Sequence, residues 1–496
     1  MSSVVEYSQA SVHPPRHGVG RRLTLLLVST LTIMAGATIS PSLPAIEAHF
    51  RATEHAALLT RFVLTMPSLF IALSAPLVGL AADRIGRRMV LLAAIVLYGL
   101  AGMSGLIVES LQGLLVGRAL LGIAVAGIMT SGTALVADYF AGPERDRFMG
   151  LQSAFVGFGG LMFLVGGGLL AEVHWRFPFG VYGFAILLVP LVALFILDPS
   201  RVSEQVAARH VGRPSRGTGM ALLAVLATAL ISNIIFYLIP TQLPFHLQSL
   251  GIGAPSQAGL AIGLMSLAAA TVSLVFGRLR SSLGPQAMFA LSFALMATGF
   301  ALVGLAAAFP AVLAATVIVG LGLGLVMPNL SSTAMSLADP AKRGRVSGAL
   351  TASIFIGHFV SPLMSQPLIR AVGSGGVFLA GSGLLACLMI LTATAAWKIH
   401  AQASPTSVAM TATEFSSAYH QDQARHDLVG TLSAGLRAMQ RHRAKRRMMV
   451  RLSRLDPHLI RDIGFDPELV YAALDGSWDE VDPGSFHSYL PRKERV

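Results

Sequence analysis

The chain has 496 residues, of which 54% are hydrophobic and only 12% are charged, and its mean hydropathy is +0.68. A soluble domain carries about 25% charged residues, so this chain has too few polar groups for a water-exposed surface, and lipid is its expected solvent. Its net charge of +12 could suit nucleic acid, but most basic residues before position 400 lie in short loops between apolar runs, as in membrane proteins. The single cysteine, Cys387, excludes a disulfide framework and a cysteine-based zinc site.

Apolar windows of about 20 residues predict twelve membrane spans. The first six lie near 22–44, 60–82, 89–108, 113–137, 148–170 and 178–198. The second six lie near 219–241, 256–279, 287–306, 309–334, 346–368 and 375–397. Short loops make neighbouring spans antiparallel, and an even number of spans puts both termini on one side of the membrane.

The basic residues between the spans predict the orientation of the chain. The even-numbered connections hold 14 of them: Arg84, Arg87, Arg88, Arg145, Arg147, Arg201, Arg209, Arg213, Arg216, Arg278, Arg280, Lys342, Arg343 and Arg345. The odd-numbered connections hold four: Arg51, Arg61, Arg176 and Arg370. The even connections and both termini are therefore predicted to be cytoplasmic, and 201–217 is the expected linker between bundles at 1–200 and 218–400.

The two halves repeat at a fixed offset of 198 residues. The matching pairs are Gly79 and Gly277, Gly86 and Gly284, Gly122 and Gly320, Arg147 and Arg345, and Gly150 and Gly348. Five matches at one offset, at corresponding places relative to the spans, indicate a duplicated bundle. Two such halves, related by an axis along the membrane normal, would frame a binding site near the midplane.

The most specific motif lies between the second and third spans and reads Gly79-Leu-Ala-Ala-Asp-Arg-Ile-Gly-Arg-Arg88. Its glycines let the backbone turn and the helices approach closely, and an acid is favoured at a helix N-terminus. The motif resembles the signature of the major facilitator superfamily in this loop. The resemblance covers about residues 20–400 and implies an all-α membrane protein, with twelve transmembrane helices in two six-helix bundles that work by alternating access.

The resemblance also assigns roles to individual residues. In the family, the acid of the motif latches the cytoplasmic face against the second half, and its arginine pairs with an acid at the inner end of the fourth helix. These roles fall to Asp83, Arg87 and Asp138. The rest of the expected latch is formed by Gly79, Arg84, Gly86 and Arg88. In the second half, Ser281 and Pro285 stand at the positions of Asp83 and Arg87, so a one-sided latch is predicted.

Two residues are candidates for proton coupling, since no Asp or Glu falls near the middle of a predicted span. Arg118 is predicted to lie inside the bilayer, where an arginine costs at least about 2.5 kcal/mol, so it should face a polar interior. With Gly122 it resembles the family's fourth-helix motif, which is linked to proton coupling; the alternative is an arginine satisfied by backbone carbonyls. His358 is the best titratable candidate, and its alternative is a hydrogen-bonded packing residue.

The fifth span bears on the direction of transport. Exporters of the superfamily carry a Gly-Pro followed by paired glycines there, whereas this chain has Phe163-Leu164 in place of Gly-Pro and keeps Gly166-Gly167-Gly168. The resemblance favours export of a small organic solute or drug in exchange for protons, with uptake by the same fold as the alternative. The polar cavity candidates, each alternatively a helix–helix contact, are Thr38, Asn233, Tyr237, Gln242 and Gln366.

No phosphate-binding loop, His-Glu-x-x-His or Gly-x-Ser-x-Gly motif is present, so a transporter is predicted rather than an enzyme, with no metal and no cofactor. The expected setting is a bacterial inner membrane, where a monomer binds a small solute, protons and lipid. After a linker at 401–436, the tail at 437–496 resembles the YjiS-like domain at Asp462-Ile-Gly464, which implies RNA or regulatory binding. Its arginines could instead rest on anionic lipid, and a membrane-anchored sensor is the alternative from another functional class.

Overall fold

The computed structural model describes residues 18–140, 142–197, 216–339 and 342–403. By their internal contacts, the described residues up to 400 belong to one compact unit. The predicted YjiS-like tail lies outside the described residues. So do residues 1–17 and nearly all of the predicted linker at 201–217.

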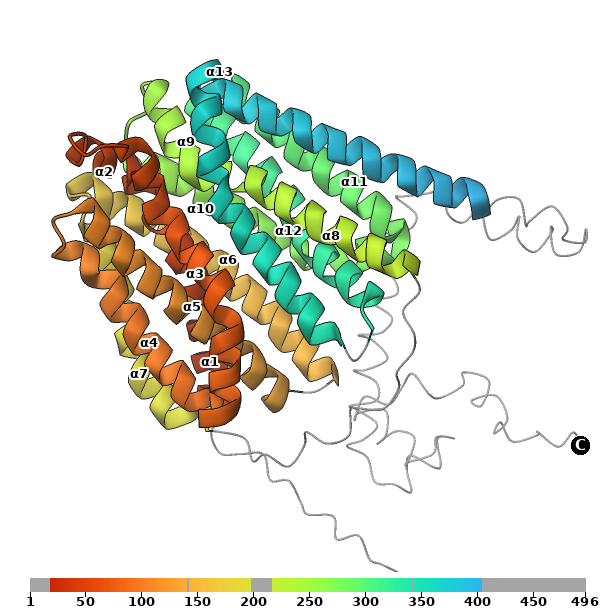
Figure 1. The fold of residues 1–496 in the computed structure, drawn as a ribbon, viewed down its shortest axis with the longest axis horizontal. Helices are drawn as coiled ribbons and strands as arrows, with labels where there is room; N and C mark the ends of the chain where they lie inside the picture. The colour runs from red at the N-terminus through yellow and green to blue at the C-terminus, as the bar shows by residue number, and fades with distance from the viewer. Residues whose placement is uncertain (1–17, 141, 198–215, 340–341, 404–496) are drawn as a thin grey trace, which may run out of the picture. The chain divides into compact units, whose positions relative to one another are not determined.

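Helices make up the described part of this unit, and Figure 1 shows the earlier ones, red to yellow, gathered apart from the later ones, green to blue. The first half contains α1 (Gly18–Ala37), η1 (Ser40–Ser42), α2 (Leu43–His49), α3 (Ala56–Ile85), α4 (Arg87–Met103), η2 (Ser104–Leu106), α5 (Leu111–Tyr139), α6 (Gly142–Val173), η3 (Phe177–Gly183) and α7 (Phe184–Phe195). The second half contains α8 (Arg216–Phe236), α9 (Leu238–Ser249), α10 (Pro255–Ser273), α11 (Phe276–Leu305), α12 (Phe309–Leu337) and α13 (Arg343–Ala403).

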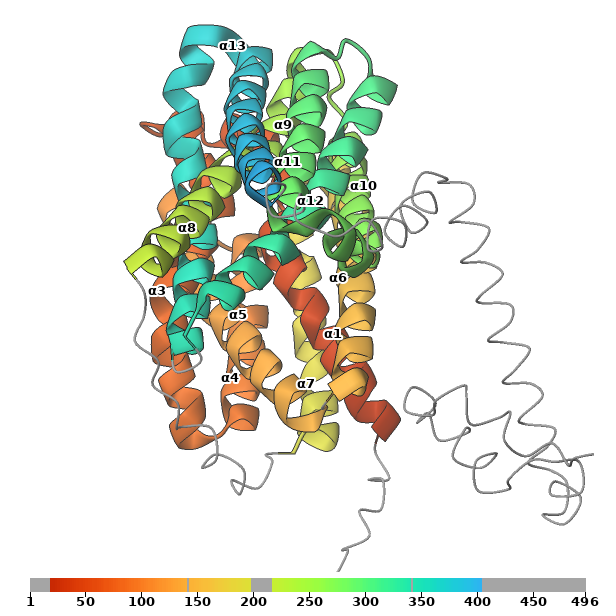
Figure 2. The same cartoon turned by 90° about the vertical axis from the view of Figure 1, so that its right-hand side faces the viewer.

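Eleven helical segments of the described chain are long and apolar enough to cross a membrane, and the last of them makes two passes. It runs from Arg343 to Ala396, which is 54 residues, or about 80 Å at 1.5 Å per residue, against a hydrocarbon core of about 30 Å. At Gly373 the backbone leaves the helical region, with φ 76° and ψ 177°, a conformation that L side chains rarely adopt. Figures 1 and 2 both show α13 turning back on itself, so the chain makes the twelve predicted passes.

The predicted eighth span, 256–279, was wrong at its end. Helix α10 stops at Ser273, and α11 begins at Phe276 with a kink at Gly284, where φ is 76°. Arg280, predicted to lie in a loop, is therefore helical, and its guanidinium bonds to the Asn329 side chain on α12. Hydropathy could not place this break, because residues on both sides of it are apolar.

The sequence repeat extends to the packing of the helices. A Cβ added to Gly122 on α5 would lie 2.4 Å from the Pro67 carbonyl oxygen on α3. A Cβ added to Gly320 on α12 would lie 2.3 Å from the Met265 carbonyl oxygen on α10. Pro67 and Met265 are themselves 198 residues apart, so the two halves repeat a backbone-to-helix contact and not only a residue pattern.

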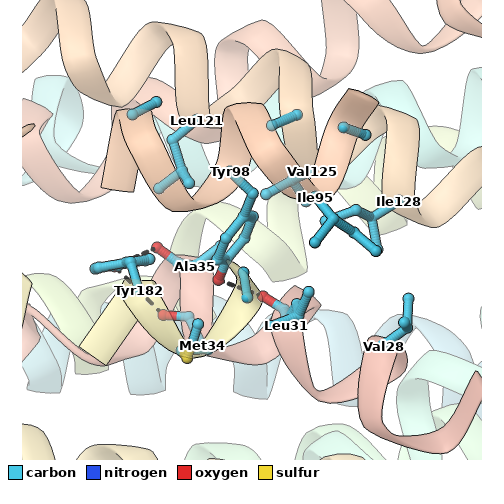
Figure 3. Packing of buried hydrophobic residues seen from close by; sticks show 14 of the residues in the cluster. Val28, Leu31, Met34, Ala35, Ile95, Tyr98, Leu121, Val125, Ile128 and Tyr182 are labelled. Carbon is cyan, nitrogen blue, oxygen red and sulfur yellow. Dashed lines mark hydrogen bonds between the residues drawn. The ribbon is translucent and has the colours of Figure 1, made fainter. Parts of the chain in front are cut away.

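Buried tyrosines tie the first half together around α1. The Tyr98 hydroxyl on α4 donates to the Leu31 carbonyl at 2.7 Å, and the Tyr182 hydroxyl of η3 donates to the Ala35 carbonyl at 3.2 Å. Figure 3 shows both side chains directed at the α1 backbone within an apolar cluster. Because lipid cannot satisfy a buried hydroxyl, each of these bonds fixes a helix in place as well as packing it.

The two halves meet along α6 and α10. A Cβ on Gly157 would lie 2.1 Å from the Ala270 Cβ, and one on Gly259 would lie 2.3 Å from the Leu164 carbonyl oxygen. Small residues allow helices to approach closely in lipid. Of the three glycines considered above for the direction of transport, Gly168 packs at this seam, since a Cβ on it would lie 2.7 Å from the Ser256 Cα.

Two adjacent glycines of α6 make a matched test of close packing within the first half. A Cβ on Gly167 would lie 2.4 Å from the Thr38 carbonyl oxygen, whereas one on Gly166 meets nothing within 4 Å. We expect Gly167→Ala to destabilise the protein by about 1–3 kcal/mol through overpacking, and Gly166→Ala to leave stability unchanged. Thermal unfolding of the purified variants in detergent measures this, and equal midpoints for the two would contradict the packing.

Candidate functional site

A cavity of about 530 Å³ lies between the two halves. Its walls come from α1, α5 and α6 of the first half and from α8, α10 and α12 of the second. None of its lining residues is Asp, Glu, Lys, Arg or His, and its polar groups include hydroxyls and one amide: Ser29, Thr32, Thr133, Gln152, Ser153 and Ser266. Such a lining suits an uncharged, largely apolar molecule with a few hydrogen-bonding groups, because a buried charge would lack a partner.

The cavity is displaced toward one face of the helices. We call this the Arg87 face, where α3 ends and α4 begins, and the opposite one the Glu47 face, where α2 lies. On α5 and α6 the lining residues fall at 128–136 and 149–157, close to the ends of these helices at the Arg87 face.

The halves are in contact at the Glu47 face. The Ser40 hydroxyl donates to the Pro240 carbonyl, and Phe62 on α3 stacks on Phe359 of α13 with centroids 5.1 Å apart. Glu172 of α6 accepts hydrogen bonds from the backbone and side chain of Ser256 on α10. The interface is thus held together on one side and hollow on the other, the asymmetry of a carrier that opens to one face at a time.

At the Arg87 face, Arg87 of α4 forms an ion pair with Asp138 of α5 and is 3.4 Å from the Ala134 carbonyl. Both side chains are about a quarter exposed, at 24% and 23%. The turn between α3 and α4 passes through Gly86, with φ 103°, and Arg88 donates to the Ala193 carbonyl at 2.7 Å. These contacts join helices of the first half to one another.

The other motif residues lie at the same turn. Asp83 is exposed, and within the described part of the chain it has no hydrogen-bond or ion-pair partner. Arg84 is also exposed, and Gly79 lies against Thr130 of α5, 3.7 Å from a Cβ built there. The pairing of Arg87 is thus visible, while the latch role of Asp83 stays a prediction.

Arg118 does not face a polar interior, contrary to expectation. It is 1% exposed within the first half and does not line the cavity. Its guanidinium lies over the rings of Phe179 and Tyr182, each 4.8 Å from the centroid, and Nη2 donates to the Gly102 carbonyl at 2.9 Å. Nε and Nη1 have no hydrogen-bond partner among the described residues. Aromatic faces attract cations, which sequence spacing alone could not reveal.

Three predicted residues come together in the second half. His358 Nε2 donates to Asn233 Oδ1 at 3.0 Å, and its ring stacks on Tyr237 with centroids 4.1 Å apart. Asn233 is fully buried and donates in turn to the Ala229 carbonyl. The group belongs to α8, α13 and the turn into α9, and none of the three lines the cavity. Their contacts resemble the packing alternative more than a ligand site.

The remaining cavity candidates lie elsewhere. Thr38 is buried and donates to the Met34 carbonyl of its own helix. Gln242 is buried at the Glu47 face, and Gln366 lines a separate cavity of about 240 Å³ there with His55 and Arg370. Thr38, Gln242 and Gln366 do not line the main cavity, and their role in binding solute stays a prediction.

Sequence reasoning also misplaced Arg61, which was assigned to a connection. It lies in α3, with a side chain 6% exposed, and forms an ion pair with Glu47 at 2.5 Å. The predicted span began at residue 60, so Arg61 already fell inside it, and this was the available signal. The first half therefore buries two arginines, Arg61 and Arg118, where one was expected.

Two bundles of lipid-spanning helices around a one-sided cavity define a membrane carrier. The family model of the Major Facilitator Superfamily matches residues 25–362, and the chain belongs to that superfamily.

Similar proteins include Multidrug resistance protein 1 of Bacillus subtilis, 26% identical over 358 residues that cover 70% of this chain and 89% of that protein. The class C tetracycline resistance protein of Escherichia coli is 26% identical over 384 residues, 74% of this chain and 96% of that protein. Among solved structures, a D-xylose-proton symporter matches with a TM-score of 0.64 at 16% identity, covering 76% of this chain and 97% of that one. This last likeness shows the fold alone.

The His358–Asn233 pair can be tested by a double-mutant cycle. We expect His358→Phe to keep the stacking on Tyr237 but to leave the buried Asn233 oxygen unsatisfied, at a cost of about 1–3 kcal/mol. Asn233→Leu in the His358→Phe background should recover much of this loss, because both polar partners are then gone. Thermal unfolding in detergent reports the cycle, and additive losses would show that the hydrogen bond does not couple the two residues.

Proposed function

We propose that this protein is a secondary active transporter that exports a small, uncharged organic solute across a bacterial inner membrane in exchange for protons. The observation that carries the proposal is the charge-free cavity of about 530 Å³ that is lined by both halves. A drug-sized solute fits a cavity of that size. A cavity shared by both halves is where alternating access requires a substrate to bind.

The direction of export rests on two further points. The Arg87 face carries most of the loop arginines, so the positive-inside rule makes it cytoplasmic, together with both termini. Two similar proteins are named for resistance to multiple drugs and to tetracycline, which supports removal of a solute from the cell. Uptake by the same fold is the rival, since the cavity chemistry is equal for both directions.

The site residues receive roles within this cycle. Asp83, Arg87 and Asp138 form the cytoplasmic latch, with Asp83 free to engage the second half when the Arg87 face closes. Arg118 and His358 are retained as coupling residues, acting through the helices they hold rather than by contact with solute. The unit works as a monomer, since each half lines the cavity of the same chain.

Transport into vesicles of known orientation tests the direction. Inside-out vesicles acidified by respiration should accumulate an uncharged fluorescent amphiphile, and a protonophore should abolish the accumulation. Right-side-out vesicles that accumulate the same probe under an inward proton gradient would instead establish uptake.

Filling the cavity should stop transport without unfolding the protein. Ser153 lines the cavity on α6, whereas Met162 on the same helix is 55% exposed on the outer surface of the bundle. We expect Ser153→Trp to reduce transport at least about tenfold, equivalent to about 1.4 kcal/mol of binding, and Met162→Trp to have no effect. Membrane levels and detergent unfolding midpoints verify folding, and normal transport by the Ser153 variant would remove this cavity from the pathway.

Arg118 is tested against a second arginine that also lies over an aromatic ring. Arg118→Met should retain downhill movement of solute but lose accumulation against a gradient, because the buried charge is gone. Arg176→Met is the control, since Arg176 lies over Trp175 and bonds to the Leu106 carbonyl but is only half-buried. Gradient-driven accumulation at the wild-type level in Arg118→Met would exclude Arg118 from coupling.

A further inference from the structure

A buried arginine joins the two halves at the Glu47 face. Arg61 of α3 donates through Nη1 to Glu47 Oε2 at 2.5 Å and through Nε to Gln242 Oε1 at 3.1 Å. Its guanidinium carbon lies 3.8 Å from the centroid of the Phe245 ring. Glu47 belongs to the first half, whereas Gln242 and Phe245 belong to α9 of the second.

The network continues into α13. Gln242 Nε2 donates to Ser365 Oγ at 3.0 Å, and both residues are about 2% exposed. The amide of Gln242 is thus oriented by partners on both sides, its oxygen toward Arg61 and its nitrogen toward Ser365. The Glu47 face cannot open without withdrawing Gln242 and Phe245 from Arg61.

The charges of this network are balanced by one carboxylate. Glu47 is the only acid bonded to Arg61 among the described residues. Its side chain is 31% exposed, while that of Arg61 is 6% exposed. A proton from the aqueous side can therefore reach Glu47 while Arg61 stays shielded. Removing one partner of a buried ion pair strongly destabilises the arrangement, because it leaves an uncompensated charge.

We infer that protonation of Glu47 opens a gate at the Glu47 face. The gate is formed by Arg61, Gln242, Phe245 and Ser365. A proton from the medium at the Glu47 face adds to the Glu47 carboxylate, which becomes neutral. Arg61 keeps its charge and loses its counter-ion, so the closed arrangement is destabilised relative to one in which the halves part and water reaches the guanidinium. Loss of the proton restores the pair and closes the face. The inference uses the alternating access of the proposed function but neither its direction nor its substrate.

Other ionisable groups on the elements at this face have different contacts. His246 on α9 bonds to Ser374 and the Val303 carbonyl, Glu172 to Ser256, and His49 packs on Phe50 and Trp175. The remaining charged or titratable groups near these elements are Arg51, Glu54, His55, Glu109, His174, Arg176 and Arg370. Within the described chain none of them pairs with Glu47 or Arg61. Their own response to pH therefore has to be separated from that of Glu47 by control variants.

The experiment measures opening of the Glu47 face directly and needs no substrate. Spin labels are attached at Ala52→Cys, before α3, and Gln248→Cys, on α9, in a Cys387→Ser background; both labelled positions are exposed. Pulsed electron paramagnetic resonance in lipid nanodiscs gives the distance between the two labels. It is measured at about pH 7.5 and about pH 4.5, which span much of the range in which glutamate carboxyls titrate. We expect acid to raise the ratio of long to short distances at least about fivefold, the lower end of typical coupling between sites.

The variants separate Glu47 from the other titratable groups. Glu47→Gln should show the long distance at both pH values, and Glu47→Asp, which keeps the charge, should keep the response to pH. Glu54→Gln is the control, since the Glu54 side chain is 89% exposed, and it should respond as the parent does. If Glu47→Gln does not fold, Arg61→Met serves in its place and should likewise abolish the pH response.

Two results would overturn the inference: a parent protein whose distance distribution does not change with pH, or a Glu47→Gln variant that keeps the change. Both are distinct from failure of the proposed function, because proton-driven transport could persist with a different proton site. Conversely, import of solute would overturn export and leave the gate intact.

Discussion

Helices in lipid gain no hydrophobic free energy from burying apolar side chains against one another, because the lipid tails are equally apolar. What positions the helices of this chain is close backbone contact at small residues and a few hydrogen bonds that lipid cannot supply. The seam between α6 and α10 shows the first, where Gly157 and Gly259 leave no room for a side chain. The hydroxyls of Tyr98 and Tyr182 on the α1 backbone show the second.

This constraint explains why the interface between the halves is uneven. The halves approach closely along the seam at small residues such as Gly157 with Ala270 and Gly168 with Ser256, and Leu164 of α6 is buried in the apolar cluster of the second half. A charged contact between the halves is placed at the Glu47 face, where Arg61 meets Gln242, whereas the Arg87–Asp138 pair at the other face joins two helices of the first half. Small residues along the seam let one bundle tilt on the other, while the Glu47 face is held or released by specific bonds between the halves.

The sequence predicted the parts of the molecule that depend on solvent and on repetition. The apolar windows predicted twelve passes, because the thickness of the lipid sets the length of a span. The offset of 198 residues predicted the paired glycines, because both halves repeat the same backbone geometry. The turn at Gly86 followed from the glycines of the motif, and the pairing of Arg87 with Asp138 followed from the resemblance to the superfamily.

The sequence did not show which face of each helix points toward the cavity. A span that is apolar all round gives no amphipathic stripe, so Thr38 and Gln366 could not be told from true lining residues such as Ser29 and Gln152. The same limit hid the environment of Arg118, since whether an arginine meets water or the faces of Phe179 and Tyr182 depends on residues more than 60 positions away.

The Arg61 network is most informative where it departs from the repeat. Residues 198 positions after Glu47 and Arg61 are Phe245 and Gly259. Phe245 is the ring against Arg61, and Gly259 is the close contact with the Leu164 carbonyl. Equivalent positions of one ancestral bundle have thus become an ion pair in the first half and, in the second, the surfaces that pack against the first.

A duplicated scaffold needs only matching backbones to fold, so a symmetric pair of apolar contacts would have satisfied packing at these positions. Burying a charged pair there instead adds a desolvation penalty that apolar residues of similar volume would avoid. Such a pair gives the closed face a dependence on charge that packing cannot provide. The same reasoning applies to Arg118, whose repeat partner is Thr316. Both arginines that are buried in the described part of the chain lie in the first half, where duplication alone gives no reason for them.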